Sequence, residues 1–224
     1  MKNFNYTNIR SISITILSVV FLLSISTLSF GQDTDKRTYD VKPYSAVKVG
    51  GAFKVYYTPS SSYDVVIVAD ADQISKIKAY VLGNTLHIKT KNVINIRTIE
   101  AHISAPFLDE IDLSGACRFI IEEGETLKTK SLELDVSGAT SVSGDIDVDY
   151  LQTDASGASK IVLSGFADRH QCELSGASIL RAKELITRDV DVKASGASVA
   201  NVTYKETITV DKSGAASVRS KKVR

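Results

Sequence analysis

The triplet Ser-Gly-Ala occurs six times in the sequence, from residue 114 onward. The serines of the six copies are Ser114, Ser137, Ser156, Ser175, Ser195 and Ser213. They are separated by 23, 19, 19, 20 and 18 residues. A period near 20 residues is typical of solenoids, in which each repeat forms one turn that cannot bury its apolar face alone. The spacing therefore predicts a stack of coils with one triplet per coil.

The residues around the triplets alternate between apolar and polar. Before the second triplet, Leu132, Leu134 and Val136 alternate with Glu133 and Asp135. A period of two with many β-branched residues predicts β-strands. Further apolar segments between the triplets add one or two short strands to each coil. Because equivalent strands of successive coils would pair, the sequence predicts an all-β fold, a parallel β-solenoid (β-helix) with coils of about 20 residues.

The glycine of each triplet allows two interpretations. If the strand runs straight through, the glycine lies on the inward side, where space is tight. If the chain bends there, the glycine supplies the backbone freedom that a bend requires. Both interpretations predict a column of small residues. These residues are small either only because the coil geometry requires it, or also because the column packs against a flat partner. Gly50-Gly51-Ala52 resembles a degenerate earlier copy of the triplet.

The N-terminal part of the chain has a different pattern. Residues 71–77 predict one helical turn with Asp70 or Asp72 as its N-cap, and Gly83-Asn84 predicts a hairpin turn. We expect a signal peptide over 1–31, one solenoid domain over 32–224, a capping region over 32–104, regular coils over 105–219 and a basic tail over 220–224.

Residues 1–31 have the features of a secretory signal peptide. Lys2 and Arg10 precede an apolar run over 12–28, and Ser29-Phe30-Gly31 provides small residues for cleavage. Serines and threonines interrupt the run, which disfavours an uncleaved anchor. We expect export to the periplasm, the cell surface or the medium, with no membrane span after cleavage.

The charge of the expected mature chain is nearly balanced. Without Lys2 and Arg10, the 27 basic residues become 25, against 26 acidic residues. This balance gives no overall attraction to nucleic acid, so no nucleic-acid partner is expected.

The sequence contains two cysteines, Cys117 and Cys172. Because disulfides form and persist in exported proteins, a disulfide between these two residues is the first hypothesis. However, the two residues occupy different positions relative to their triplets and lie two to three coils apart. At about 4.8 Å per coil this separation exceeds the reach of a disulfide. We predict two unpaired, buried cysteines.

Catalytic and metal-binding patterns are weak. His87, His102 and His170 are far apart in the sequence, and six equivalent serines without a neighbouring histidine favour a structural column over nucleophiles. Asp145, Asp147 and Asp149 resemble the start of a calcium loop, but Tyr150 and Ser156 replace its glycine and glutamate. We interpret these aspartates as the outward face of a strand, and we expect no catalytic residue, metal or cofactor.

The repeated motifs resemble those of a known family of exported proteins, common in Bacteroidetes and described as putative auto-transporter adhesin, head GIN domain. The resemblance covers nearly all of residues 40–219 and rests on segments 49–55, 83–88, 111–116 and the later triplets. It implies a right-handed parallel β-solenoid and a role in cell-surface adhesion, with no catalytic or binding residues to transfer.

Three functions follow from these observations. The first is an exported, non-enzymatic adhesion module with a protein or glycan partner. The second is a periplasmic envelope scaffold that assembles as a homo-oligomer through its C-terminal coil. The third is an enzyme acting on polysaccharide, which would require Asp147, Asp149 and either Asp168 or Glu173 to converge.

Overall fold

The computed structural model describes residues 34–90 and 99–224. The signal peptide expected over 1–31 therefore lies outside the described residues. The strands are β1 (Thr34–Tyr39), β2 (Ala46–Gly51), β3 (Phe53–Pro59), β4 (Asp64–Asp70), β5 (Ile77–Leu82), β6 (Thr85–Thr90), β7 (Ile99–Ala105), β8 (Glu110–Gly115), β9 (Arg118–Ile121), β10 (Thr126–Val136), β11 (Ser141–Ala155), β12 (Lys160–Leu174), β13 (Ile179–Ala194), β14 (Val199–Lys212) and β15 (Ser217–Lys222). The only helical segment among the described residues is the 3-10 turn η1 (Ile74–Lys76).

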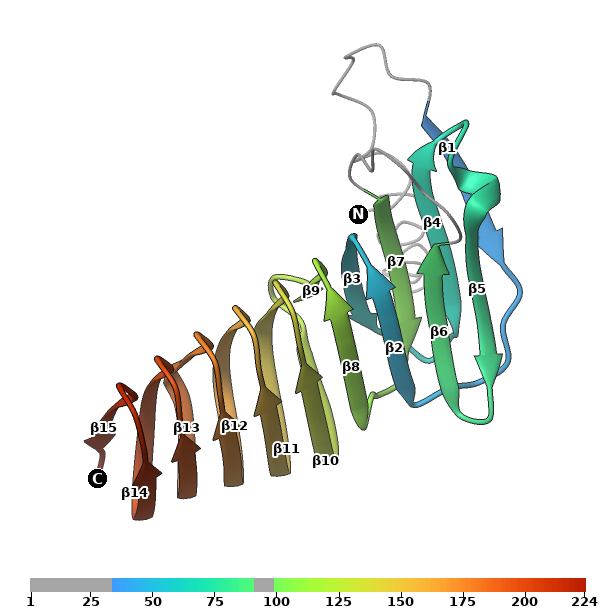
Figure 1. Cartoon of the computed structure of the whole chain (residues 1–224). Coiled ribbons are helices and arrows are strands. Elements are labelled where there is room, and N and C mark those ends of the chain that lie inside the picture. The colour runs from blue at the N-terminus through green and yellow to red at the C-terminus, as the bar shows by residue number, and fades with distance from the viewer. Residues whose placement is uncertain (1–33, 91–98) are drawn as a thin grey trace, which may run out of the picture. The chain divides into compact units, whose positions relative to one another are not determined.

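The prediction of an all-β parallel solenoid is confirmed. From β8 and β9 onward, each strand pairs in parallel with its equivalent in the next coil, and the stack has about six turns (Figure 1). Coils of about 20 residues follow from this register, since Ser141 of β11 pairs with Lys160 of β12.

One complete coil is divided by bends into three short faces. In β11, Val142 is buried on the first face, Ile146 and Val148 on the second, and Leu151 and Thr153 on the third. The inward parity changes between Val148 and Leu151, as expected where the chain turns a corner. Below, the sheet that follows each triplet is called the post-triplet face, and the sheet that leads into the next triplet is called the pre-triplet face.

The triplets form the corner between these two faces. Gly157 has a φ of +71°, and a Cβ added there would lie 2.8 Å from the carbonyl oxygen of Gly138 in the preceding coil. The amide of Ala158 donates to that same oxygen at 2.8 Å, so the hydrogen-bond ladder continues through the turn. The bend is therefore confirmed, and so is the tight space at the glycine, although the strand does not run straight through. Gly51 pairs with Gly115, which places the degenerate copy in the same column.

The inside of the coils is filled mainly by aliphatic side chains. Both cysteines are buried and free, as predicted. Cys172 lies on an inward row with Thr153 and Val192. The residue after each of the first five triplets is also buried and small. This row contains Cys117, Thr140, Ser159, Ser178 and Ser198.

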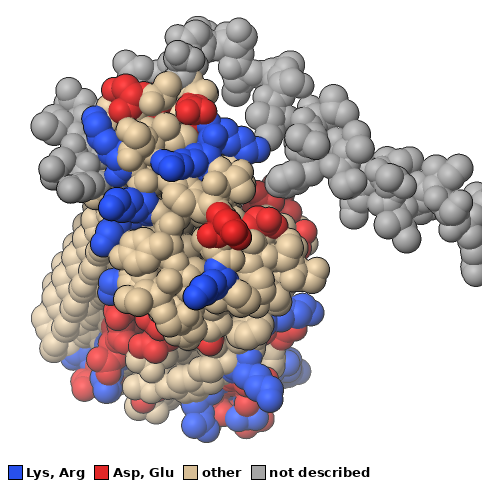
Figure 2. All heavy atoms as spheres, turned by 90° about the vertical axis from the view of Figure 1, so that its right-hand side faces the viewer, with Lys and Arg blue, Asp and Glu red and all other residues tan. Residues whose placement is uncertain are grey.

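The N-terminal end of the stack is closed by antiparallel strands. The parallel strands β2 and β3 belong to the solenoid, whereas β1, β4 and β7 pair antiparallel in that order, and β5 and β6 form the hairpin predicted at Gly83. Basic and acidic side chains are interspersed over this end, around an uncharged area (Figure 2). The predicted N-cap at Asp70 or Asp72 is wrong. Gln73 precedes η1 without a side-chain capping bond, because its own amide donates to the Asp70 carbonyl as part of a tight turn.

Candidate functional site: a polar groove on the pre-triplet face

Three outward rows of side chains cross the pre-triplet face. The row nearest the corner consists of the triplet serines. The next, here the carboxylate row, contains Asp112, Asp135, Asp154, Glu173, Lys193 and Asp211 in strict register. The third, here the outer row, contains Glu110, Glu133, Gln152, Gln171, Asp191 and Thr209. Parallel pairing places each side chain about 4.8 Å from its equivalent in the next coil.

A groove of about 400 Å³ lies between the serine and carboxylate rows. It follows the coils of β10 to β14. Its lining includes two lysines, Lys193 and Lys212, with the acidic residues Asp135, Asp154, Glu173 and Asp211 and the hydroxyl residues Ser156, Ser175, Ser195 and Ser213.

Like charges stacked in one row raise the proton affinity of the carboxyl groups. Partial burial, together with Asp112 and Asp154 on either side, raises the pKa of Asp135. Partial burial and the neighbouring Glu110, Asp135 and Asp154 raise the pKa of Glu133. These two carboxyl groups therefore hold their protons more tightly than isolated side chains do.

Two lysines neutralise parts of this row. Lys48 of β2 forms an ion pair with Asp112, and Lys193 lies 2.7 Å from Glu173. The carboxylates of Asp135 and Asp154, between these two pairs, have no ion-pair partner among the described residues. The middle of the groove thus keeps its negative charge for contact with hydrogen-bond donors or cations.

Four of the six triplet serines line the groove. Ser137 and Ser195 donate to the carbonyl groups of Leu113 and Leu174 in the preceding coil, both at 3.3 Å. These bonds extend the coil-to-coil ladder to the side chains. The prediction that the serines form a structural column agrees with this geometry.

An aromatic pair continues the carboxylate row at the hairpin end. His87 pairs with Lys48 in β2, and Tyr80 pairs with His87. The two rings stack with their centroids 5.2 Å apart, and Lys89 Nζ lies 5.2 Å from the Tyr80 centroid. The predicted Gly83-Asn84 hairpin already places the two residues opposite each other, but their alignment with the carboxylate row depends on the pairing of β6 with β2.

The aspartates that resemble a calcium loop point outward, as predicted. Ile146 and Val148 between them are buried. Asp145 accepts a hydrogen bond from Thr126 at 2.9 Å, and Asp147 lies 3.3 Å from Lys128. The described residues contain no group of three or more His, Cys, Asp or Glu side chains that could hold a metal ion.

Of the carboxylates considered for polysaccharide chemistry, only Glu173 lines the groove. Asp147 lies on the second face of its coil, and Asp149 and Asp168 occupy equivalent positions of successive coils at the bend beyond it. Asp147, Asp168 and Glu173 each face a basic side chain, with Arg188 lying 2.8 Å from Asp168. The three histidines are equally dispersed. His87 lies on the pre-triplet face, His102 on the post-triplet face and His170 in the core.

Most of the carboxylate row could have been found from the sequence. In five of the six copies, the residue two positions before the triplet serine is acidic, and Lys193 is the exception. This fixed offset gives a row of like charge once one triplet is assigned to each coil. The groove itself could not be predicted, because it depends on which way the corner bends.

The sequence and the fold of this chain are similar to those of known proteins. The family model described as putative auto-transporter adhesin, head GIN domain, matches residues 43–222. The chain belongs to this family. The resemblance noted from the sequence motifs is thereby confirmed.

Three solved structures have a fold similar to that of this chain. A putative adhesin from Bacteroides fragilis is 20% identical, with a TM-score of 0.73, covering 84% of this chain and 96% of its own. A putative lipid binding protein from Parabacteroides distasonis is 16% identical, with a TM-score of 0.57, covering 86% and 97%. A putative adhesin from Parabacteroides merdae is 17% identical, with a TM-score of 0.57 and the same coverage. At these identities the likeness establishes the fold.

The curated proteins contain no match to this chain. Family membership fits a protein that is exported or lies at the cell surface. In the part of the chain that the structure describes, no helix is long and apolar enough to cross a membrane.

Proposed function

We propose that this protein is an exported, non-enzymatic adhesion module that binds its partner along the groove of the pre-triplet face. The observation that carries the proposal is the repetition of the groove lining, in which carboxylates and serine hydroxyls recur on successive coils. A repeated row offers many equivalent contacts to an elongated partner. Membership of a family described as adhesins supports this function.

The chemistry of the groove favours a partner rich in hydrogen-bond donors. Ionised carboxylates accept charge-assisted hydrogen bonds, and serine hydroxyls both donate and accept. Sugar hydroxyls and the ammonium or guanidinium groups of a protein fit this lining. No comparable observation favours an enzyme, since only Glu173 among the acidic side chains considered for catalysis lines the groove.

The location at the cell surface is tested by fractionation combined with protease treatment of intact cells. Adhesion predicts that the protein is digested before the cells are broken. Digestion only after lysis would support the alternative of a periplasmic scaffold.

The groove is tested with beads that carry the purified protein, applied to the surfaces that the producing cells colonise. We expect D154N/E173Q to reduce bead attachment several-fold. D147N/D168N removes the same charge from other faces and should leave attachment unchanged. Equal losses in both variants, or turnover of a polysaccharide by the purified protein, would overturn the proposal.

A further inference from the structure

The post-triplet face carries the opposite charge to the groove. Two outward rows cross this sheet from β1 to β15. The first contains Lys36, Val68, Glu100, Lys54, Arg118, Ser141, Lys160, Ile179, Val199 and Ser217. The second contains Thr38, Val66, His102, Tyr56, Ile120, Ser143, Val162, Arg181, Asn201 and Arg219. These two rows hold six cations and one carboxylate. On the pre-triplet face, the carboxylate row and the outer row, counted together with Lys48, hold two cations and eight carboxylates.

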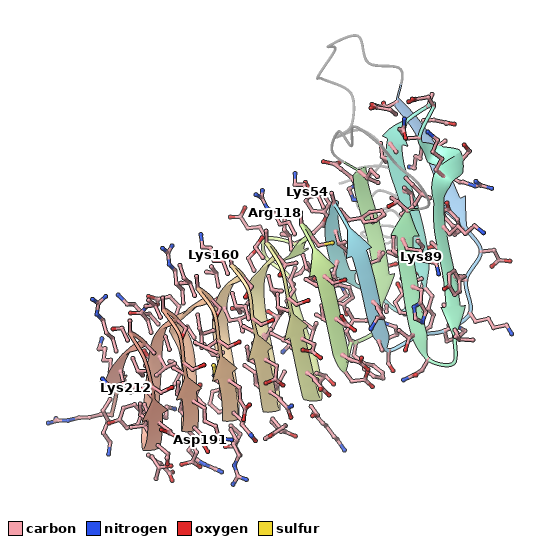
Figure 3. The ribbon with its side chains drawn as sticks, viewed as in Figure 1. Lys54, Lys89, Arg118, Lys160, Asp191 and Lys212 are labelled. Atoms are coloured by element: carbon pink, nitrogen blue, oxygen red, sulfur yellow. The ribbon has the colours of Figure 1, made fainter. Side chains whose placement is uncertain are left out.

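Most cations of the post-triplet face have no ionic partner. Lys54 lies 3.5 Å from Glu100. Arg118, Lys160, Arg181 and Arg219 form no ion pair within residues 34–90 and 99–224. Figure 3 shows Lys54, Arg118 and Lys160 in succession along the stack, away from Asp191. Unpaired charges of one sign on one face produce a positive potential that an overall net charge near zero conceals.

Aliphatic side chains lie between these cations on the solvent side of the sheet. Val162 is 36% exposed, and Ile120, Ile179 and Val199 are partly exposed beside it. Tyr56 lies on the same side, where its ring stacks on His102 at 4.9 Å and Lys54 Nζ is 4.7 Å from its centroid. Solvent-facing aliphatic and aromatic side chains among cations suit an interaction surface for a protein or a membrane.

We propose that the post-triplet face docks on a membrane surface containing anionic phospholipids. The stacked sheet presents its cations across a broad face. A membrane surface with anionic lipids is planar and negatively charged, and it does not require a fixed spacing between the cations. The aliphatic and tyrosine side chains suit the interfacial region, where apolar burial adds to electrostatic attraction. This inference goes beyond the proposed adhesive function and uses the face opposite in charge to the groove.

A second copy of the chain fits this face less well. Its complementary charge lies in the carboxylate and outer rows, whose members within the coils are all polar. Contact between the two faces would bury aliphatic side chains against carboxylates and remove those carboxylates from water, which is unfavourable. A lipid surface avoids this desolvation, because lipid phosphates stay hydrated beside the apolar region.

Co-sedimentation with vesicles tests the proposal. We expect the purified protein to bind vesicles of phosphatidylglycerol and phosphatidylcholine, and not vesicles of phosphatidylcholine alone, with weaker binding as salt is raised. R118Q/K160Q/R181Q should weaken binding roughly 100-fold, since each cation near an anionic surface contributes about 1 kcal/mol. The matched control is K48Q/K128Q/K193Q, which removes three cations from the other faces and should change binding less than about twofold.

Lysine acetylation of the unaltered protein provides a second readout that does not depend on the folding of any variant. Anionic vesicles should protect Lys160 and leave Lys193 reactive. Binding that is equal for both vesicle types, equal loss in the two triple variants, or protection of Lys193 instead of Lys160 would overturn the proposal. Vesicle-free assembly that R118Q/K160Q/R181Q abolishes would also overturn it, by assigning the face to a second copy.

Discussion

The pre-triplet and post-triplet faces have the same backbone geometry within the coils, but their outward side chains carry opposite charge. Within the coils both are parallel sheets to which each coil contributes one strand segment, and they are joined at the Ser-Gly-Ala corner. The first carries a carboxylate row and a groove, and the second carries unpaired cations among aliphatic residues. The coil geometry therefore fixes where outward side chains lie. The residue types that occupy each outward row can differ from one face to the other. A solenoid can thus present two chemically different surfaces from one repeat.

The corner that joins the two faces should be the most sensitive part of the molecule. Gly157→Val places a β-branched residue at a φ of +71° and its Cβ 2.8 Å from the Gly138 carbonyl oxygen. We expect the free energy of unfolding to fall by roughly 3 kcal/mol or more, against about 0.5 kcal/mol or less for Ser156→Ala. Chemical denaturation measures both.

Gly124→Val is the control for this substitution. Gly124 also has a positive φ, of +84°, but no atom lies within 4 Å of an added Cβ. It should therefore show the backbone strain without the collision between coils. Equal effects at Gly157 and Ser156 would contradict the assignment of the triplet as a stacked corner.

The second prediction concerns a titratable group in the core behind the pre-triplet face. His170 is completely buried, and its Nε2 lies 3.1 Å from Thr153 Oγ1. Burial lowers the pKa of His170 from 6.5 to about 4. Because this pKa is lower in the folded than in the unfolded state, stability should be lost as the pH falls from about 6.5 to about 4. The loss should reach up to roughly 3 kcal/mol.

The double variant H170L/T153V removes this buried polar pair together. Its free energy of unfolding should therefore depend less on pH than that of the unaltered protein between pH 7 and pH 4. Urea denaturation at several pH values measures the difference. An identical pH dependence of the two proteins would show that His170 does not titrate on unfolding.

The smallest expected effect lies on the surface of the pre-triplet face. Burial and the neighbouring Asp112 and Asp154 raise the pKa of Asp135, so ionisation of Asp135 opposes folding. Asp135→Asn should raise the free energy of unfolding by about 0.5 kcal/mol at pH 7. The increase should be smaller in high salt, which screens the neighbouring charges. It should disappear at pH values below the pKa of the unfolded carboxyl group, where Asp135 is protonated in both states. Asp147→Asn is the matched control and should lose a little stability, because it breaks the pair with Lys128.

Much of the architecture followed from local patterns in the sequence. The spacing of the triplets gave the length of the coil, and the alternation of Leu132, Leu134 and Val136 gave the inward side of the strand. These predictions succeeded because period and parity are properties of neighbouring residues. The same parity applied to His170, Cys172 and Leu174 would have placed the histidine in the core.

The predictions that failed or were missed concern contacts at short connections and their place in the sheet. The turn before Ile74 has no side-chain cap at Asp70 or Asp72, and the amide of Gln73 donates to the Asp70 carbonyl instead. The predicted hairpin at Gly83 already implies that Tyr80 lies opposite His87. The alignment of this pair with the carboxylate row does not follow from local sequence, because it depends on the pairing of β6 with β2.

By itself, the sequence determined a solenoid of about 20-residue coils, a column of small residues at one corner and two buried, free cysteines. Only the tertiary structure decided that the triplet glycine lies at a bend and that opposite charges gather on different faces. The physical reason is that parity assigns a side chain to the inside or the outside of a coil, whereas the bends decide which outside face it joins. A net charge near zero is therefore compatible with one acidic face and one basic face.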